Sequence, residues 1–372
     1  MVEVKQIPFF NYPALFSKNE KDYMAIVYDV LKRGAYIMQK DLEEFEANLA
    51  QYLAVKHAIG TADGTMALLM SLTAAGVGQG DEVIVPSHTF IASVAAIHHT
   101  GAIPVLADCG NDHLIDADAI EKLISLKTRA IMPVHLNGRT ANMDAIGALA
   151  KRHNLIIIED ACQALGSKFK GRFAGTFGMA GAFSFYPSKT LGCFGDGGVV
   201  VTNDDSIAAK LLCLRDHGRG SDGKVSCFGF NARLDNLHAA ILNFKLNTYD
   251  DEIQDRRRLS KIYHNNLKDL REVMLPPAPE EDKDHFDIFQ NYEIEADHRN
   301  ELRDFLLSNG VKTILQWGGH TVHQFEKLGL KGTLPYTEKM TQRFMLLPMN
   351  TSLEPADINY ICGQIIKFYR RK

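Results

Sequence analysis

Hydrophobic residues recur along the first two-thirds of the chain in two alternating patterns. An apolar stripe at Leu42, Phe45, Leu49 and Leu53 has the three- to four-residue spacing of an amphipathic helix. Short apolar or β-branched runs predict strands at 57–60, 82–85, 103–107, 130–134 and 155–158. Helix-like stretches lie between them at 66–75, 91–99, 117–124 and 143–153. Such alternation predicts an α/β fold, a mostly parallel sheet with helices on both faces.

The pattern changes near residue 247, where we place a domain boundary. Before it, residues 197–203 predict a strand, and Asp204 or Asp205 can cap the helix that runs to about Arg215. After it, a polar helix over 250–270 is followed by a proline-rich segment and an acidic run at 280–284. A strand at 290–294 and helices at 299–309 and 355–369 complete a small α+β domain. We predict an N-terminal arm and large domain over 1–247 and a small domain over 248–372.

Composition and charge narrow the class of protein. The 372 residues are 46% hydrophobic with a formal net charge of −4, which gives no basic bias toward nucleic acid or anionic lipid. The first twenty residues lack the basic and apolar regions of a secretion signal, and the apolar runs are too short to cross a bilayer. The six cysteines form no Cys-x-x-Cys pair. We expect a cytoplasmic protein that binds neither metal, nucleic acid nor membrane.

Asp160 and Lys189 are the first candidates for chemistry. Asp160 ends an apolar strand, at the sheet edge where open α/β folds bind ligands, and a carboxylate there can keep a pyridine nitrogen protonated. Lys189 follows a short apolar strand and a Pro-Ser turn, where desolvation and neighbouring positive charge would make its amine a nucleophile. The alternatives are a carboxylate that caps the next turn and an ordinary surface lysine.

Two further segments suit a phosphate and an aromatic ring. Gly64 and Thr65 open a helix whose N–H groups can bind an anion together with the Thr65 hydroxyl, and Ser184 could add a donor. Phe90 lies just beyond the strand at 82–85 and could stack on a cofactor ring. A plain turn with its cap, and a core phenylalanine, remain the alternatives.

These segments together resemble the DegT/DnrJ/EryC1/StrS sugar aminotransferases, within the fold-type I pyridoxal phosphate enzymes. The likeness covers most of the chain and rests on Gly64-Thr65, Pro86-x-x-Thr-Phe90, Asn137-Gly-x-x-Ala-Asn-Met-Asp144, Glu159-Asp-Ala-Cys-Gln163, Phe183-Ser-Phe with Lys189, Gly197-Gly198 and Gly229-Phe-Asn231-Ala-Arg-Leu-Asp235. The resemblance implies a fold-type I aminotransferase, with a seven-stranded type of sheet between helices in the large domain and a small α+β C-terminal domain.

The resemblance also implies roles for single residues. Lys189 would carry pyridoxal 5′-phosphate as a Schiff base, with Asp160 facing the pyridine nitrogen. Gln163 would lie near the phenolic oxygen, and Phe90 would stack on the ring. The phosphate contacts implied are Gly64, Thr65, Ser184 and, from the neighbouring subunit of a homodimer with shared active sites, Asn231.

The reaction implied by the resemblance is a transamination in two halves. Glutamate would leave its amino group on the cofactor as pyridoxamine 5′-phosphate, and a nucleotide-diphosphate-linked 3-keto or 4-keto sugar would then accept it. Such amino sugars feed lipopolysaccharide, glycoprotein or antibiotic synthesis.

One stretch departs from the family pattern. Many relatives carry an aromatic-Pro-x-Pro-x-His-x-Gln motif in the small domain, whereas residues 314–325 here contain no proline. We expect His320 or His323 to face the sugar, Trp317 to stack on a ring, and Arg219 to contact a carboxylate or phosphate. Structural roles for all four stay open.

Three other functions compete with this interpretation. A sugar dehydratase of the same family would have histidine in place of Lys189, which argues against it. A different fold-type I enzyme could be an amino-acid aminotransferase, or a desulfurase with Cys193 or Cys227 as its reactive cysteine. A third alternative is a sensory or regulatory protein that binds the cofactor without turnover, and no DNA-binding segment or basic patch supports it.

Overall fold

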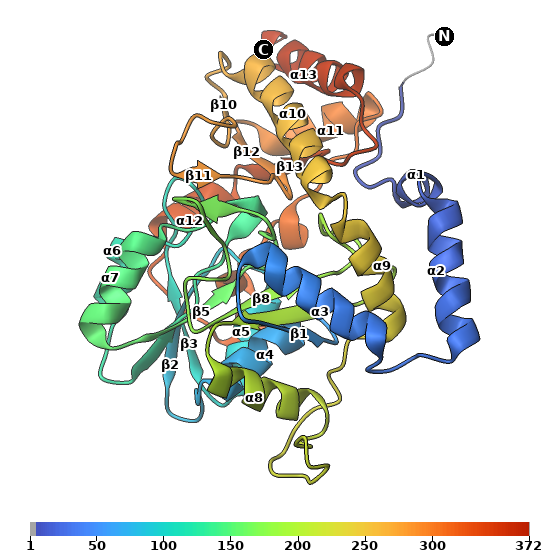
Figure 1. Ribbon diagram of the computed structural model, residues 1–372. Helices are drawn as coiled ribbons and strands as arrows, with labels where there is room; N and C mark the ends of the chain where they lie inside the picture. Colours follow the sequence, from blue (N-terminus) through green and yellow to red (C-terminus); the bar gives the residue numbers. More distant parts are fainter. Residues whose placement is uncertain (1–4, 372) are drawn as a thin grey trace.

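Seven short strands form the central sheet of the large lobe in this computed structural model, which describes residues 5–371 (Figure 1). Their order is β1 (His57–Thr61), β9 (Gly198–Thr202), β8 (Ala180–Ser184), β5 (Ile156–Asp160), β4 (Thr128–Ile131), β2 (Glu82–Pro86) and β3 (Ile103–Ala107). Only β9 runs antiparallel to its neighbours; the other pairs are parallel. The predicted mostly parallel sheet is confirmed.

The strand expected at 130–134 is shifted toward the N-terminus. It begins at Thr128 and ends at Ile131. Pro133 has no N–H to donate to a ladder, so regular pairing stops before it. The chain stays extended, and Val134 forms an isolated bridge to Asp160.

Helices of the large lobe cover both faces of this sheet. They are α3 (Lys40–Leu53), α4 (Gly64–Ala74), α5 (Ile91–His99), α6 (Ala117–Leu123), α7 (Met143–His153), α8 (Asp205–Arg215) and α9 (Asn236–Leu246). Alternate residues of β9 face opposite sides. Val200 packs in the core that contains Leu68 of α4, and Val199 in the core that contains Leu49 of α3.

Local capping fixes where two of these helices begin. The Asp204 carboxylate accepts from the N–H groups of Ser206 and Ile207 at the start of α8, as expected. Asp63 does the same for α4 by accepting from Met66 N at 2.8 Å. The predicted apolar stripe of α3 is buried along its whole length.

The small lobe is an α+β unit built on the long helix α10 (Tyr249–Leu267). Its sheet has the order β10 (Val273–Met274), β12 (Tyr292–Ala296) and β13 (Phe344–Leu347), and all pairs are antiparallel. Around it lie α11 (Arg299–Ser308), α12 (Pro335–Thr341) and α13 (Pro355–Arg370).

Two segments connect the lobes. The start of α10 packs in the large-lobe core through Tyr249, and later turns pack in the small-lobe core through Tyr263. Ile7 of the N-terminal arm is also buried in the small-lobe core and bridges to Val311. The boundary at 247/248 therefore stays a prediction, and residues 1–4 of the first predicted domain lie outside the described residues.

Several elements were not predicted from the sequence. The N-terminal arm forms α1 (Tyr12–Ser17) and α2 (Glu20–Arg33), which stand beside α9 in Figure 1. A second small sheet joins β6 (Lys168–Phe169), β7 (Arg172–Phe173) and, from just after the acidic run, β11 (His285–Phe286). None of the helices within residues 5–371 has the length and apolar character needed to span a bilayer.

Candidate active site

Asp160 ends β5 and presents its carboxylate at the carboxyl edge of the sheet. It is 5% exposed. The Ser93 hydroxyl of α5 donates to Oδ2 at 2.6 Å, and the Cys162 N–H donates to Oδ1 at 3.2 Å. Oδ1 of Asp160 therefore caps the turn that follows β5, which was the alternative role considered for this carboxylate. Within residues 5–371 no cation forms an ion pair with Asp160, so its charge is oriented by neutral donors and is available to a ligand.

Lys189 lies on the loop after β8 and is half-buried. Burial lowers the pKa of its amine, although the nearby Cys162 and Asp160 act in the opposite direction. The prediction that a neighbouring positive charge also lowers the pKa of Lys189 is wrong, because burial is the only contribution that lowers it. Among the described residues the amine has no hydrogen-bond or ion-pair partner. A neutral, unpaired amine is the form that attacks a carbonyl carbon.

Gly64, Ser184 and Cys162 meet at the start of α4. A Cβ added to Gly64 would lie 2.8 Å from the Cβ of Ser184 and 3.0 Å from Sγ of Cys162. Because Asp63 caps Met66, the N–H groups of Gly64 and Thr65 are the first two of α4 left for another acceptor. Together with the Ser184 hydroxyl, they form a small anion-binding hollow that any larger side chain at position 64 would fill.

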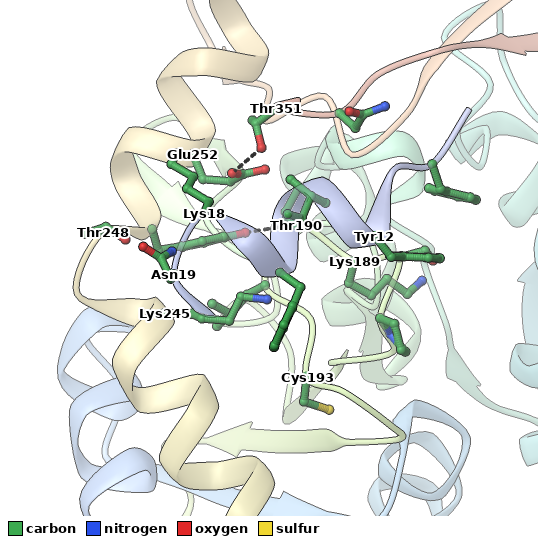
Figure 2. A pocket seen from close by; sticks show the side chains of 18 of the residues that line it. Tyr12, Lys18, Asn19, Lys189, Thr190, Cys193, Lys245, Thr248, Glu252 and Thr351 are labelled. Carbon is green, nitrogen blue, oxygen red and sulfur yellow. Dashed lines mark hydrogen bonds between the residues drawn. The ribbon is translucent and has the colours of Figure 1, made fainter. Parts of the chain in front are cut away.

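A cavity of about 690 Å³ opens beside Lys189 (Figure 2). Figure 2 shows Tyr12 of α1 next to Lys189, with Lys245 and Thr248 across the cavity. Burial lowers the pKa of Lys245 as well. The N-terminal arm thus forms one wall of this cavity, whose lining includes Lys189 but not Asp160 or Ser184. Sequence reasoning missed this wall, although the aromatic residues of the arm were a usable signal.

Gln163 is held by two asparagines: Asn137, which sequence reasoning named only as part of a motif, and Asn291, which it did not name. Its Oε1 accepts from Asn137 N at 2.8 Å and from Asn291 Nδ2 at 3.3 Å. Asn137 has a left-handed backbone, with φ of 57°. This conformation turns the chain after β4 toward the same sheet edge as Asp160.

Phe90 is 52% exposed, so the alternative of a core phenylalanine is wrong. Its ring centroid lies 6.4 Å from that of Trp317, with an angle of 34° between the planes. Trp317 comes from a short turn of the small lobe, η2 (Gln316–Gly319). The two rings therefore form an aromatic pair across the lobes.

The two histidines of the same stretch differ in their surroundings. His323 Nδ1 lies 2.7 Å from Oγ of Ser87, and burial lowers the pKa of this imidazole. His320 is exposed, with its ring 6.0 Å from that of Phe325. His323 is thus tied to the loop that carries Phe90, and His320 is free to face solvent.

Arg219 and Asn231 are not brought to Lys189. Both are exposed residues of the segment between α8 and α9, which projects beyond α8 in Figure 1. Arg219 pairs with Asp216 at 3.6 Å, and Asn231 bridges to the same residue. In the described part of the chain, no hydrogen bond or ion pair joins either of them to Lys189, Asp160 or Ser184. Within this chain the two residues are therefore not joined to the Lys189 and Asp160 pair.

Comparison with known proteins places this geometry in a family. Residues 17–366 match the model of the DegT/DnrJ/EryC1/StrS aminotransferase family. The chain is 36% identical to a Geobacillus stearothermophilus protein named as a pleiotropic regulatory protein, covering 98% of this chain and 99% of that one. It is 38% identical to a Streptomyces venezuelae dTDP-3-amino-3,4,6-trideoxy-alpha-D-glucose transaminase, covering 95% and 93%. The crystal structure of S. venezuelae DesV in complex with a ketimine intermediate superposes with a TM-score of 0.93 at 37% identity, covering 98% of both chains.

Proposed function

The chain belongs to the DegT/DnrJ/EryC1/StrS aminotransferase family, and from this membership we propose that it transfers the amino group of glutamate to a nucleotide-diphosphate-linked keto-sugar. The family's aminotransferases use pyridoxal 5′-phosphate. The observation that carries the proposal is the pair of Lys189 and Asp160, an unpaired amine with a lowered pKa near a carboxylate that lacks a counterion.

The residues present fit this cofactor. Lys189 offers an amine to its aldehyde, and Asp160 offers a carboxylate to its ring nitrogen. The hollow at Gly64, Thr65 and Ser184 offers N–H and hydroxyl donors to its phosphate. We place Phe90 against the ring and Gln163 near the phenolic oxygen.

When bound, the cofactor supplies an electron sink that stabilises negative charge at the reacting carbon of the substrate. Lys189 would hold the cofactor through Nζ, and the same amine would carry a proton to and from that carbon. Asp160, oriented by Ser93, would keep the proton on the ring nitrogen. Tyr12 and its neighbours in the arm cover one side of the cavity and limit access of water.

The acceptor is proposed to be a 3-keto or 4-keto sugar carried by a nucleotide diphosphate. A transaminase of a 3-amino sugar nucleotide stands among the similar proteins. Phe90 and Trp317 supply exposed aromatic faces on which a sugar or base can pack. His320 follows the turn that carries Trp317 and is exposed, so it is available to the hydroxyl groups of a bound sugar.

We also propose a cytoplasmic homodimer in which Arg219 and Asn231 act on the partner's site. Large apolar side chains are exposed on α2 and on the loop beyond α8, including Tyr28 at 67% and Phe228 fully exposed. Exposed large apolar side chains favour association when a partner can cover them. All six cysteines are free thiols, as a reducing compartment would keep them.

The experiment is a visible absorbance spectrum of the purified protein with pyridoxal phosphate, followed by glutamate and then by keto-sugar nucleotides. We expect a lysine-linked visible band that glutamate abolishes and that a 3-keto or 4-keto sugar nucleotide restores, with an amino sugar detected by mass spectrometry. A band that forms but never responds to any amino donor would mean that the protein binds the cofactor without turnover. Restoration by a keto acid alone would indicate an amino-acid aminotransferase.

A further inference from the structure

Glu293 is a buried carboxylate at the junction of the two lobes. It lies on β12, in a strand whose five residues are all buried. Its Oε1 lies 3.3 Å from Nε2 of His88 and 2.7 Å from Nδ1 of His113, and it accepts from Nδ2 of Asn137 at 3.1 Å. Its Oε2 accepts from Nε2 of Gln316 at 2.9 Å. Three of these four partners belong to the large lobe, so this one side chain joins both lobes.

The charge of Glu293 is balanced inside the protein. Burial opposes its ionisation, but the nearby His88 and the hydrogen bond from His113 outweigh burial and hold the pKa of Glu293 far below its usual value. Burial likewise opposes protonation of His113, but hydrogen bonds to Glu293 and Glu295 raise the pKa of His113 to about 9. The cluster is therefore a carboxylate paired with an imidazolium at neutral pH.

The Glu293 carboxylate is satisfied by protein groups. Ligand atoms of His88, His113 and Glu293 all lie within 4.8 Å of one another. Both ring nitrogens of His113 bond to carboxylates, Nδ1 to Glu293 and Nε2 to Glu295 at 3.1 Å. The contacts that hold Glu293 in this structure are therefore hydrogen bonds within the protein.

The turn beside Glu293 has an unusual backbone. Trp317, Gly318 and Gly319 follow one another with φ of 51°, 74° and 86°. For a bulky residue such as Trp317 this conformation is strained and persists only when its surroundings fix it. The fixing contacts come from Gln316, which is 5% exposed and donates to Glu293 and, at 2.6 Å, to Asn137.

The same contacts set the position of the Trp317 ring. The ring packs at 5.2 Å against His88, which is itself bound to Glu293. It also lies beside the ring of Phe90, with the ring centroids 6.4 Å apart. Asn137 extends the connection to Gln163 by donating from its backbone N–H. Glu293 thus contacts His88 and Gln316, which position Trp317, and it contacts Asn137, which holds Gln163.

We propose that Glu293 is a positioning residue that fixes the Gln316–Trp317 turn against Phe90 and thereby sets the affinity for the sugar-nucleotide acceptor. This inference rests on the proposed function for the identity of the acceptor. Among the described residues, the hydrogen bonds of Glu293 go to His88, His113, Asn137 and Gln316 and not to Lys189, Asp160 or Ser184, so its loss should affect the half-reaction with glutamate less than the binding of the acceptor. The neutral amide of a Gln variant cannot balance the imidazolium of His113, so it should loosen the turn.

The test compares Glu293→Gln with the wild type and with Glu293→Asp, which keeps the charge. Hydrogen bonds to a charged group of this kind correspond to about 10- to 100-fold in an equilibrium constant. We expect Glu293→Gln to raise KM for the keto-sugar nucleotide by about that factor, with kcat and the glutamate half-reaction changed less than about threefold. Glu293→Asp should recover part of the loss. An equal fall in both half-reactions would overturn the proposal.

A second readout does not depend on turnover. Trp317 is the only tryptophan of the chain, so its fluorescence reports on the turn directly. We expect acrylamide to quench Glu293→Gln more strongly than the wild type. Unchanged quenching overturns the positioning role even if activity falls, and stronger quenching with an unchanged KM overturns its link to the acceptor. If no keto-sugar is turned over by the wild type, the proposed function fails while this readout still tests the turn.

Gln316→Ala covers the case in which Glu293→Gln does not fold. It removes the link between the turn and Glu293 but leaves the pairing of Glu293 with His113 intact. The same rise in KM and in quenching is expected. A Gln316→Ala variant that matches the wild type in both would refute the proposal.

Discussion

The Ser93 hydroxyl donates to Oδ2 of Asp160 at 2.6 Å and joins α5 to the end of β5. This bond orients a carboxylate without neutralising it, which is what a group facing a ring nitrogen requires. Asp160→Asn keeps the shape and removes the charge, so we expect kcat to fall by at least about 100-fold. Ser93→Ala keeps the charge and should cost about 10-fold or less. Steady-state rates at saturating cofactor check both, and equal losses would contradict the electrostatic role of Asp160.

The identity of the cofactor-bearing lysine can be tested with a matched pair of variants. Lys189 and Lys245 line the same cavity, and burial lowers the pKa of both. Lys189→Ala should abolish the visible band formed with pyridoxal phosphate, whereas Lys245→Ala should retain it. If Lys189→Ala kept the visible band at full strength, the cofactor would be attached to another lysine, and Lys245 would be the first candidate.

The pH dependence of cofactor attachment follows from the lowered pKa of Lys189. The amine becomes neutral at a lower pH than the ordinary value of 10.5, so its reaction with an aldehyde should accelerate with a midpoint below 10.5. Stopped-flow absorbance of the reconstitution of the apoprotein from pH 6 to about 11 measures that midpoint. A midpoint at or above the ordinary lysine value would show that Lys189 is solvated.

The anion hollow depends on the missing side chain of Gly64. Gly64→Ala places a methyl group 2.8 Å from Ser184 and should weaken cofactor binding at least about 10-fold, with a stability loss of about 1–3 kcal/mol. Gly147→Ala, in α7 with no atom within 4 Å of the added Cβ, is the control and should be neutral or slightly stabilising. Cofactor titration and urea unfolding separate the two effects. Tight binding by Gly64→Ala would place the phosphate elsewhere.

Stability should fall at alkaline pH because of His113. Its pKa is about 9 in the folded protein against 6.5 for the free side chain, so its contribution is complete below pH 6.5 and is lost as the pH rises through 9. The shift corresponds to about 3 kcal/mol. Urea unfolding at pH 7 and pH 10 should show this loss in the wild type and a smaller one in His113→Gln. The same pH slope in both proteins would rule out His113 as its source.

Much of the fold was determined by local sequence. The apolar stripe of α3 and the aspartates that cap α8 and α4 act within a few residues, so helix starts and strand positions could be predicted from spacing alone. Local sequence made Lys189 and Asp160 candidates, but it left a surface lysine and a turn-capping carboxylate as alternatives until the resemblance to a family implied their roles. Asp160 ends β5 and Lys189 lies on the loop after β8, and the ends of these two parallel strands lie at one edge of the sheet.

Only the tertiary structure decided how distant segments complete the site. Phe90 meets Trp317, and His88 meets Glu293, across the two lobes, and no local periodicity encodes such a pairing. The N-terminal arm forms a wall of the cavity for the same reason. Sequence patterns record which face of an element is apolar, because that depends on neighbours along the chain. Which elements then meet, and which buried charges they pair, depends on how the two lobes pack.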